Sequence, residues 1–340
     1  MGFVNWEWGK RMTKDAVLEL LREADGFVSG QQMSEKLQLT RAAVWKAIQA
    51  LREDGYAIES ATNRGYRLAA PTGRLCRTEI LRRLEGHPWA DTVTVLDSVD
   101  STNTYCKKIA AGGAPHGTVV IADRQTEGKG RLGRSFASPA GVGLYLSVIL
   151  RPNVPPVELL HLTAVAAEAA VEAVHETTGL RPGIKWTNDL VIGRRKFVGI
   201  LTELSLQAES GLVEYAVIGI GTNCNHGDGD FPPEVRPMAI SLREATGQVV
   251  DRNAYAAALI RWLHQADAQL LTHKADWMSR YAADCITVGR DVRVIRGGTV
   301  RCAHADGVDE NAALLVTYED GSREAVSSGE VSVRGMYGYL

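Results

Sequence analysis

The chain has 340 residues, of which 45% are hydrophobic and 23% are charged, and its formal net charge is −2. This composition is typical of a globular protein that is long enough for two or three domains. Because the charges nearly balance, they exclude bulk attraction to nucleic acid or to a membrane, and any DNA contact must come from a local basic patch.

The sequence carries no recognisable signal for export or membrane insertion. No apolar run approaches the roughly 20 residues that cross a bilayer, and "MGFVNWEWGKRMTKD" lacks the apolar centre of a signal peptide. We expect the first eleven residues to be unstructured, and either Met1 or Met12 to be the true start. The five cysteines show no C-x-x-C spacing, which argues against disulfides or a zinc site and for the reducing cytoplasm.

Residues 13–69 are predicted to form three short helices and a hairpin. "TKDAVLELLREADG" has its apolar residues on one helical face and ends at Gly26, and "SGQQMSEKLQL" gives a short second helix. "TRAAVWKAIQALREDG" predicts a third helix that begins at a capping Thr40 and ends at Gly55. "YAIESATNRGYRLA" alternates around a turn, as a β-hairpin does.

This order of elements is the layout of a winged helix-turn-helix, whose second helix of the pair enters the major groove. The alternative is a helical protein-interaction module, because residues 10–70 hold ten Lys or Arg against eight Asp or Glu. We favour DNA binding because the basic residues cluster on the third helix and the wing, where Arg67 accompanies the others. The candidate DNA-contacting residues are Arg41, Trp45, Lys46, Gln49, Arg52 and Arg64.

The rest of the chain is predicted to be a linker and two further domains. Residues 70–75, "APTGRL", contain Pro and Gly and are predicted to be the linker. Residues 76–284 mix strand patterns such as "GLYLSVILRP" with helical ones such as "RNAYAAALIRWLHQADAQLL", which predicts an α+β domain with a mixed sheet. Residues 285–340 hold short β segments between "RGG" and "EDGS" turns and are predicted to be a small β-barrel.

A glycine-rich run, "GKGRLG" at 128–133, matches the G-x-G-x-x-G spacing of dinucleotide sites. Such a site needs a helix after the glycines, but "RSFASPAGVGLYLSVIL" contains Pro139 and then a strand pattern. The run is therefore not a nicotinamide or flavin site. Lys129, Arg131 and Arg134 alternate among its glycines, which suits a flexible loop that encloses a polyanion, although a solvated basic loop is the alternative.

Four motifs occur in a characteristic order: "DSVDSTNTY", "ADRQTEGKGRLGRSFASPAGVGLYLSV", "IKWTNDLVIGRRKFVGILTEL" and "IGIGTNCN". Together they resemble the bacterial biotin protein ligases, over nearly the whole chain. The winged helix resembles that of the bifunctional members, which also repress transcription of biotin genes. The resemblance implies a class II synthetase-like fold for the central domain and an SH3-like barrel for the C-terminal one.

The resemblance also implies a reaction in two steps. The biotin carboxylate attacks the α-phosphate of ATP, with Mg²⁺ expected, to give biotinyl-5′-adenylate and pyrophosphate. A lysine of a biotin carboxyl carrier protein then attacks the mixed anhydride and releases AMP. The implied partners are this carrier protein and double-stranded operator DNA, which a homodimer would bind once the adenylate has formed.

Residue roles are implied position by position. The implied catalytic residues are Lys196, which touches both the biotin carboxylate and the α-phosphate, and Arg131 of the glycine-rich loop. The implied biotin-binding residues are Ser101, Thr102, Asn103, Gln125, Lys129, Gly130, Arg131, Lys196, Gly199 and Ile200. The implied nucleotide-binding residues are Arg131, Arg134, Phe136, Asn188, Asp189 and Asn223. Asp189 is either a ligand of Mg²⁺ or a structural carboxylate, and Lys185 and Trp186 could equally shape the site.

Three positions depart from the pattern of the family. Many members have Arg in place of Lys129, Trp in place of Phe136 and Pro in place of Thr187. Lysine keeps the charge but loses bidentate geometry, so weaker retention of the adenylate is expected. Phenylalanine keeps a stacking face without the indole N–H, and threonine stiffens the loop less than proline would. None of these changes removes a group on which the chemistry depends.

Two other functions remain open at this point. One is a transcription factor that senses biotin without ligating it, against which the presence of Lys196 and Arg131 argues. The other is a relative of the lipoate ligases, which the basic glycine-rich loop and the winged helix both disfavour.

Overall fold

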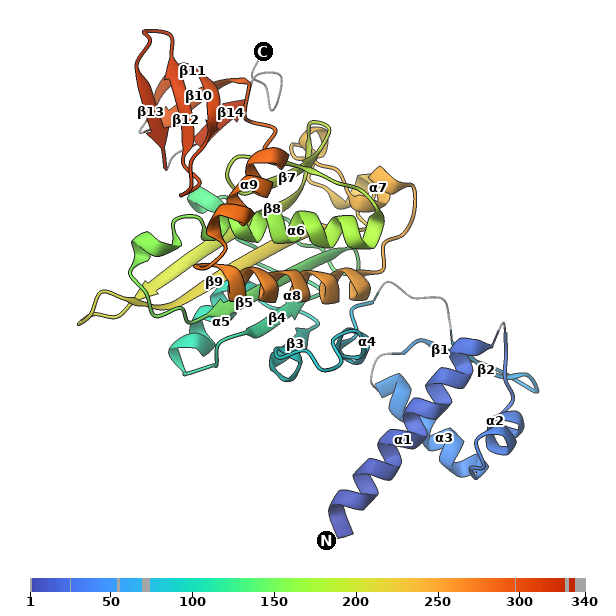
Figure 1. The fold of residues 1–340 in the computed structure, drawn as a ribbon. Helices are drawn as coiled ribbons and strands as arrows, with labels where there is room; N and C mark the ends of the chain where they lie inside the picture. Colours follow the sequence, from blue (N-terminus) through green and yellow to red (C-terminus); the bar gives the residue numbers. More distant parts are fainter. Residues whose placement is uncertain are drawn as a thin grey trace. The chain divides into compact units, whose positions relative to one another are not determined.

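The computed structural model describes residues 2–24, 26–53, 56–68, 74–296, 298–327 and 330–333 (Figure 1). The chain divides into two compact units, Met1–Glu79 and Ile80–Leu340. Most of the predicted linker at 70–75 lies outside the described residues, and so does Gly55, the predicted end of the third helix.

The first unit contains three helices and a hairpin in the predicted order. Its elements are α1 (Gly2–Glu23), α2 (Gly30–Lys36), α3 (Arg41–Glu53), β1 (Ile58–Ala61) and β2 (Gly65–Leu68). The prediction that the first eleven residues are unstructured is wrong, because α1 begins at Gly2, and this helix ends before Gly26. This helix contains no Pro, and its two glycines are Gly2 and Gly9.

Local hydrogen bonds explain where the helices of the first unit begin. Ser29 and Gln32 form a reciprocal capping box at the start of α2. Thr40 Oγ1 accepts from the Ala43 N–H at 3.1 Å, which confirms the predicted cap of α3. The hairpin turns at Asn63 and Gly65, both with positive φ, and a Cβ at Gly65 would collide with the backbone of Val28.

The second unit is built on a seven-stranded sheet with the order β3-β4-β5-β9-β8-β7-β6. Its strands β3 and β4 are parallel and the other neighbours are antiparallel, which confirms the predicted mixed sheet. The strands are β3 (Val93–Leu96), β4 (Thr118–Ala122), β5 (Gly143–Leu150), β6 (Gly183–Lys185), β7 (Asp189–Ile192), β8 (Arg195–Leu206) and β9 (Val213–Asn223).

Helices cover both faces of this sheet. Helices α6 (Leu162–Thr178) and α8 (Arg252–Gln269) lie side by side across one face, where Tyr255 meets Thr222 of β9 (Figure 1). Helix α5 (Thr102–Ala111) packs through Cys106 on the other face, against a cluster that includes Val217 of β9. Positions 217 and 222 differ by an odd number, so their side chains point to opposite faces.

Several short elements were not predicted. These are β6, β7, α4 (Arg77–Arg82), α7 (Leu242–Thr246) and α9 (Lys274–Asp284). The C-terminal part forms a five-stranded antiparallel sheet with the order β13-β12-β11-β10-β14. Its strands are β10 (Asp291–Arg296), β11 (Thr299–Val308), β12 (Leu314–Tyr318), β13 (Arg323–Val326) and β14 (Glu330–Val333).

All five cysteines are free, and only Cys302 is exposed. Among the described residues, none of the helices is both long and apolar enough to span a bilayer.

A buried carboxyl group lies where α6 approaches α9. Glu168 is fully buried, and its Oε1 accepts from Arg181 NH2 at 3.3 Å, while Arg181 also pairs with Asp284 at the end of α9. Burial raises the pKa of Glu168 to about 8, and the nearby Arg181 charge only partly offsets this effect. The folded state therefore favours the protonated acid, and this contribution to stability is lost as the pH rises from the unfolded-state pKa towards 8.

We predict that Glu168→Gln removes this pH dependence. The thermal unfolding midpoints of wild type and variant, measured by calorimetry, should be similar near pH 5, and the wild type should fall below the variant by pH 8. Glu176→Gln, at an exposed position of the same helix, should keep the wild-type pH slope. Parallel pH profiles for wild type and Glu168→Gln would contradict the assignment.

Candidate active site

A row of paired residues crosses four neighbouring strands beneath a pocket. Tyr145 pairs with Gly221, Gly221 with Gly199, and Gly199 with Asp189. The two glycines at the centre have no side chains, so Phe136 and Lys196 can approach the sheet closely there. The sheet thus places a small hollow between the bulky ends of the row.

This hollow is a pocket of about 450 Å³, including its open mouth. All ten residues predicted to bind biotin line it, as do Phe136 and Asn188 from the predicted nucleotide site. Arg134, Asp189 and Asn223 do not line it. The pocket also includes residues that sequence analysis missed: Tyr145, Leu201, Gly219, Ile220 and Gly221. The two glycines of "IGIG", two residues apart, could have indicated this part of the pocket, because glycine in a strand often marks a site where a ligand or another backbone approaches the sheet closely.

One end of the pocket is a fixed polar cluster at the start of α5. Ser101 caps this helix, which confirms the capping interpretation of "STN". Gln125 Oε1 accepts from the Thr102 amide at 2.8 Å and from its hydroxyl at 3.0 Å. Ser147 Oγ donates at 2.8 Å to Thr102 Oγ1 or at 2.7 Å to Asn103 Oδ1. These contacts hold four side chains, from helix α5, a loop and strand β5, in one orientation.

An ion pair supports this polar end from behind. Glu203 accepts from Asn103 Nδ2 at 2.9 Å and from Lys107 Nζ at 2.6 Å. Burial would raise the pKa of Glu203, but the hydrogen bonds and charge of Lys107 and Asn103 hold it below its ordinary value. The Asn103 amide N–H groups therefore stay engaged with Glu203 and the Leu201 carbonyl.

The glycine-rich loop is ordered by its own backbone. The Gly130 N–H donates to the Arg134 carbonyl at 2.7 Å, and the Phe136 N–H donates to the Gly128 carbonyl at 2.8 Å. Leu132, at the tip, has φ +56° and is 71% exposed. Lys129 Nζ donates to Thr104 Oγ1 at 2.9 Å and so ties the loop to α5.

Two cations meet two neighbouring polar residues at the other end of the pocket. Arg131 NH1 donates to Asn188 Oδ1 at 2.7 Å, and Lys196 Nζ donates to Asp189 Oδ1 at 2.6 Å. Asn188 Nδ2 also donates to Asp189 Oδ1 at 3.1 Å. The loop and two strands therefore bring two positive side chains together beside one carboxylate, which suits an anionic ligand.

The segment that carries Asn188 is anchored to the C-terminal sheet. The indole N–H of buried Trp186 donates to the Ala312 carbonyl at 2.8 Å, and its backbone N–H donates to Thr287 Oγ1 at 2.9 Å. Tyr281 of α9 donates its hydroxyl to the Thr187 carbonyl at 3.1 Å. Trp186 thus shapes the site from outside the pocket.

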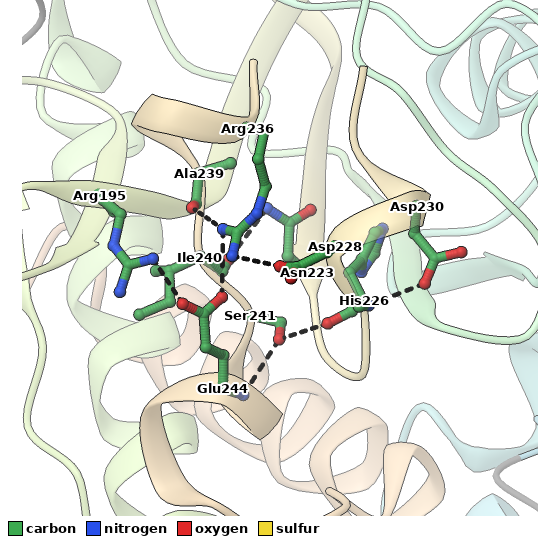
Figure 2. Close-up of polar contacts among 11 residues, drawn as sticks. Arg195, Asn223, His226, Asp228, Asp230, Arg236, Ala239, Ile240, Ser241 and Glu244 are labelled. Atoms are coloured by element: carbon green, nitrogen blue, oxygen red, sulfur yellow. Dashed lines mark hydrogen bonds and ion pairs between the residues drawn. The ribbon is translucent and has the colours of Figure 1, made fainter. Parts of the chain in front are cut away.

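A second segment is fastened to the strand that carries Lys196 (Figure 2). The Ile240 N–H donates to the Lys196 carbonyl at 3.0 Å. Asn223 Nδ2 donates to the Ile240 carbonyl at 3.3 Å. Glu244 accepts from Arg195 at 2.5 Å and from Arg236 at 3.3 Å (Figure 2). Asn223 is therefore a link between strand β9 and this segment.

Figure 2 also shows His226 behind Asn223. Its imidazole is buried and stacks on Phe231, with ring centroids 5.0 Å apart. Burial lowers the pKa of His226 to about 4. The ring is therefore neutral at physiological pH.

The predicted DNA-contacting residues lie in the first unit, and several are held by its own groups. Arg41 donates to Gln31 at 2.5 Å, and Arg52 donates to the Ile58 carbonyl at 2.9 Å. The guanidinium of Arg64 lies 4.6 Å from the centroid of Phe27. Trp45 and Lys46 are exposed on α3, and Gln49 is partly exposed.

No group of three or more His, Cys, Asp or Glu side chains is arranged to hold a metal ion in the part of the chain that the structure describes. Asp189 offers a single carboxylate. That is compatible with Mg²⁺, which often takes one or two carboxylates and completes its shell with phosphates and water.

Three family models match the chain. They are the HTH domain over residues 13–67, the biotin/lipoate A/B protein ligase family over residues 95–223, and the biotin protein ligase C terminal domain over residues 287–334. With the fold, these matches define the class: a biotin protein ligase that carries an N-terminal helix-turn-helix domain.

Relatives of full length give a closer assignment. The bifunctional ligase/repressor BirA of Bacillus subtilis is 35% identical over 93% of this chain and 97% of its own length. That of Escherichia coli is 34% identical over 91% of this chain and 93% of its own. Biotin protein ligase from Aquifex aeolicus in complex with biotin and ATP matches 71% of this chain and 98% of its own, with TM-score 0.61 and 29% identity. The chain belongs to the bifunctional ligase/repressor family of biotin protein ligases.

We predict that Gly221→Ala destabilises the protein by about 1–3 kcal/mol, because added groups in a packed interior force neighbours to shift. A Cβ there would lie 2.6 Å from the ring of Phe136. Urea denaturation measures the loss. Gly307→Ala is the control, since its nearest contact would be 3.9 Å away. Equal stability of the two variants would contradict the close packing of Phe136 on Gly221.

Proposed function

We propose that this protein activates biotin with ATP to biotinyl-5′-adenylate and transfers the biotinyl group to a lysine of a biotin carboxyl carrier protein. One observation carries the proposal: a single pocket joins a fixed polar end, at Thr102 and Gln125, to a cationic end, at Arg131 and Lys196. Biotin has matching chemistry, since its ureido ring hydrogen-bonds and its carboxylate is an anion.

The first step brings two anions together. The biotin carboxylate oxygen attacks the α-phosphorus of ATP, the P–O bond to pyrophosphate breaks, and a carboxylic–phosphoric anhydride forms. Lys196 would leave Asp189 to contact both the carboxylate and the α-phosphate, while Arg131 would offset charge on the phosphoryl oxygens. Preorganised cations stabilise such developing charge without reorganisation at the moment of reaction.

The residues present are compatible with Mg²⁺. Once Lys196 turns to the substrates, the carboxylate of Asp189 would be released to hold the ion, which supplies charge neutralisation to the phosphates when bound. Asn188 would remain beside it through its hydrogen bond to Asp189 Oδ1. The remaining predicted nucleotide-binding residues, Arg134, Phe136 and Asn223, would contact the rest of the adenylate.

In the second step the neutral amine of the carrier lysine attacks the biotinyl carbonyl. An amide bond forms, the bond to the AMP oxygen breaks, and the amine loses a proton to solvent. The anhydride is already activated, so holding the amine close to it supplies much of the rate. The glycine-rich loop, tied at Lys129 and Arg131, would exclude water that could hydrolyse the anhydride.

We further propose that the protein represses biotin genes in the cytoplasm as a homodimer. The winged helix would occupy residues 13–69, the ligase domain 76–284 and the C-terminal domain 285–340. If the adenylate changes the contacts of the loop and so supports dimerisation, two copies of α3 would meet the two halves of a palindromic operator. Unmodified carrier protein would compete for the same surface and withdraw the protein from DNA.

We predict that Lys196→Ala lowers biotin-dependent exchange of labelled pyrophosphate into ATP by about 100-fold or more, the usual cost of removing one group that stabilises transition-state charge. Lys108→Ala, at an exposed position of α5, is the matched control and should exchange like the wild type. Exchange retained in Lys196→Ala would move the catalytic centre elsewhere. Tight biotin binding without any exchange in the wild type would instead favour a sensor that does not ligate.

We predict that biotin together with ATP raises operator affinity about tenfold or more in a gel-shift assay, because dimerisation joins two weak contacts into one stronger one. Lys196→Ala cannot form the adenylate and should stay at the lower affinity under both conditions. Equal DNA affinity of the wild type with and without biotin and ATP would contradict the proposed coupling.

A further inference from the structure

A tryptophan is exposed in the middle of helix α3. Trp45 is 54% exposed, whereas the opposite face of the helix is buried through Val44, Ile48 and Leu51. The core of the first unit therefore does not need this side chain. An indole on the solvent side is available for a contact with a partner, because one side chain offers a large apolar surface and an N–H donor.

The neighbours of Trp45 on α3 identify the kind of partner. Arg41, Trp45 and Gln49 follow one another at intervals of four residues, so they share one face of the helix. Lys46 is exposed beside Trp45. The cationic and amide groups of this face suit a polyanion, and its indole suits an apolar group on the same partner.

The side chains around Trp45 are already oriented. Arg41 is held by Gln31, a residue of α2, and Arg52 is held by the Ile58 carbonyl at the start of the hairpin. Arg64 and Arg67 lie against the ring of Phe27. These contacts hold cationic groups of both α3 and the hairpin, and they favour a partner that lies across the helix and the hairpin together.

The major groove of DNA matches this arrangement. Phosphates line both edges, and the C5-methyl group of thymine is the apolar feature of the base pairs there. Hydrogen-bonding side chains distinguish the other bases, but they gain nothing from a methyl group. An indole can cover one or two such methyl groups and bury its own surface at the same time.

We propose that Trp45 sets the sequence preference of DNA binding by packing its indole against thymine methyl groups in the major groove. This inference rests on the proposed repressor function. A phosphate-binding role belongs to the cationic residues, because phosphate contacts position the protein without reading sequence.

The test uses the full chain with biotin and ATP. The probe is the best-bound duplex that the wild type selects from a pool with a randomised central region, prepared a second time with uracil in place of thymine. Uracil lacks only the methyl group. The wild type should bind the uracil duplex about fourfold more weakly for each contacted thymine, from the transfer free energy of one buried carbon.

Variants assign the effect to Trp45. Trp45→Ala should bind the thymine duplex more weakly than the wild type and should no longer distinguish the two duplexes. Trp45→Phe, which keeps an aromatic face, should keep part of the preference. Lys46→Ala is the matched control and should weaken binding to both duplexes equally. Thermal unfolding of each variant confirms that the first unit remains folded.

Four outcomes would overturn the inference. The wild type could bind both duplexes equally, or Trp45→Ala could keep the wild-type preference. Sedimentation could show that Trp45→Ala fails to dimerise while its thymine preference is unchanged, which would assign Trp45 to contact with a second copy. Failure to select any duplex would overturn the repressor function as well, and this result separates the two proposals.

Discussion

The site depends on holding two cations close together without a ligand. Arg131 and Lys196 line the same end of the pocket, and a partly buried positive charge is costly unless polar groups pair with it. Asn188 and Asp189 do this as consecutive residues, one accepting from Arg131 and the other from Lys196. An anionic substrate can then replace these oxygens one by one, so the cations never lose all their partners.

The function of Asn188 therefore depends on how the backbone segment that carries it is held in place. The residue lies between β6 and β7, two strands of three and four residues that have little pairing of their own. Trp186 compensates by joining this hairpin to Ala312, in the connection between β11 and β12, and Thr187 is joined to α9 through Tyr281. The C-terminal domain thus contributes to the geometry of the cations although none of its residues lines the pocket.

Sequence patterns predicted the long elements and the residues that carry distinctive chemistry. The apolar runs of β5 and β9 and the caps at Ser101 and Thr40 are local features, so they can be recognised from neighbouring residues alone. Glu203 and Trp186 act through partners about a hundred residues away, and no local pattern signals such contacts. The extension of α1 to Gly2 was missed because two glycines, two tryptophans and a phenylalanine among residues 2–11 give no clear helical pattern.

The contacts of Lys129 explain how a lysine can serve at this position, where many members of the family have arginine. Its ammonium reaches Thr104 on α5, and its charge also helps to lower the pKa of Glu203, which holds Asn103. The glycine-rich loop is consequently attached at Lys129 to the polar end of the pocket and at Arg131 to the cationic end. A lysine ammonium suffices for the first attachment, since it donates a single hydrogen bond to Thr104 there. The same loop therefore contacts both ends of the pocket.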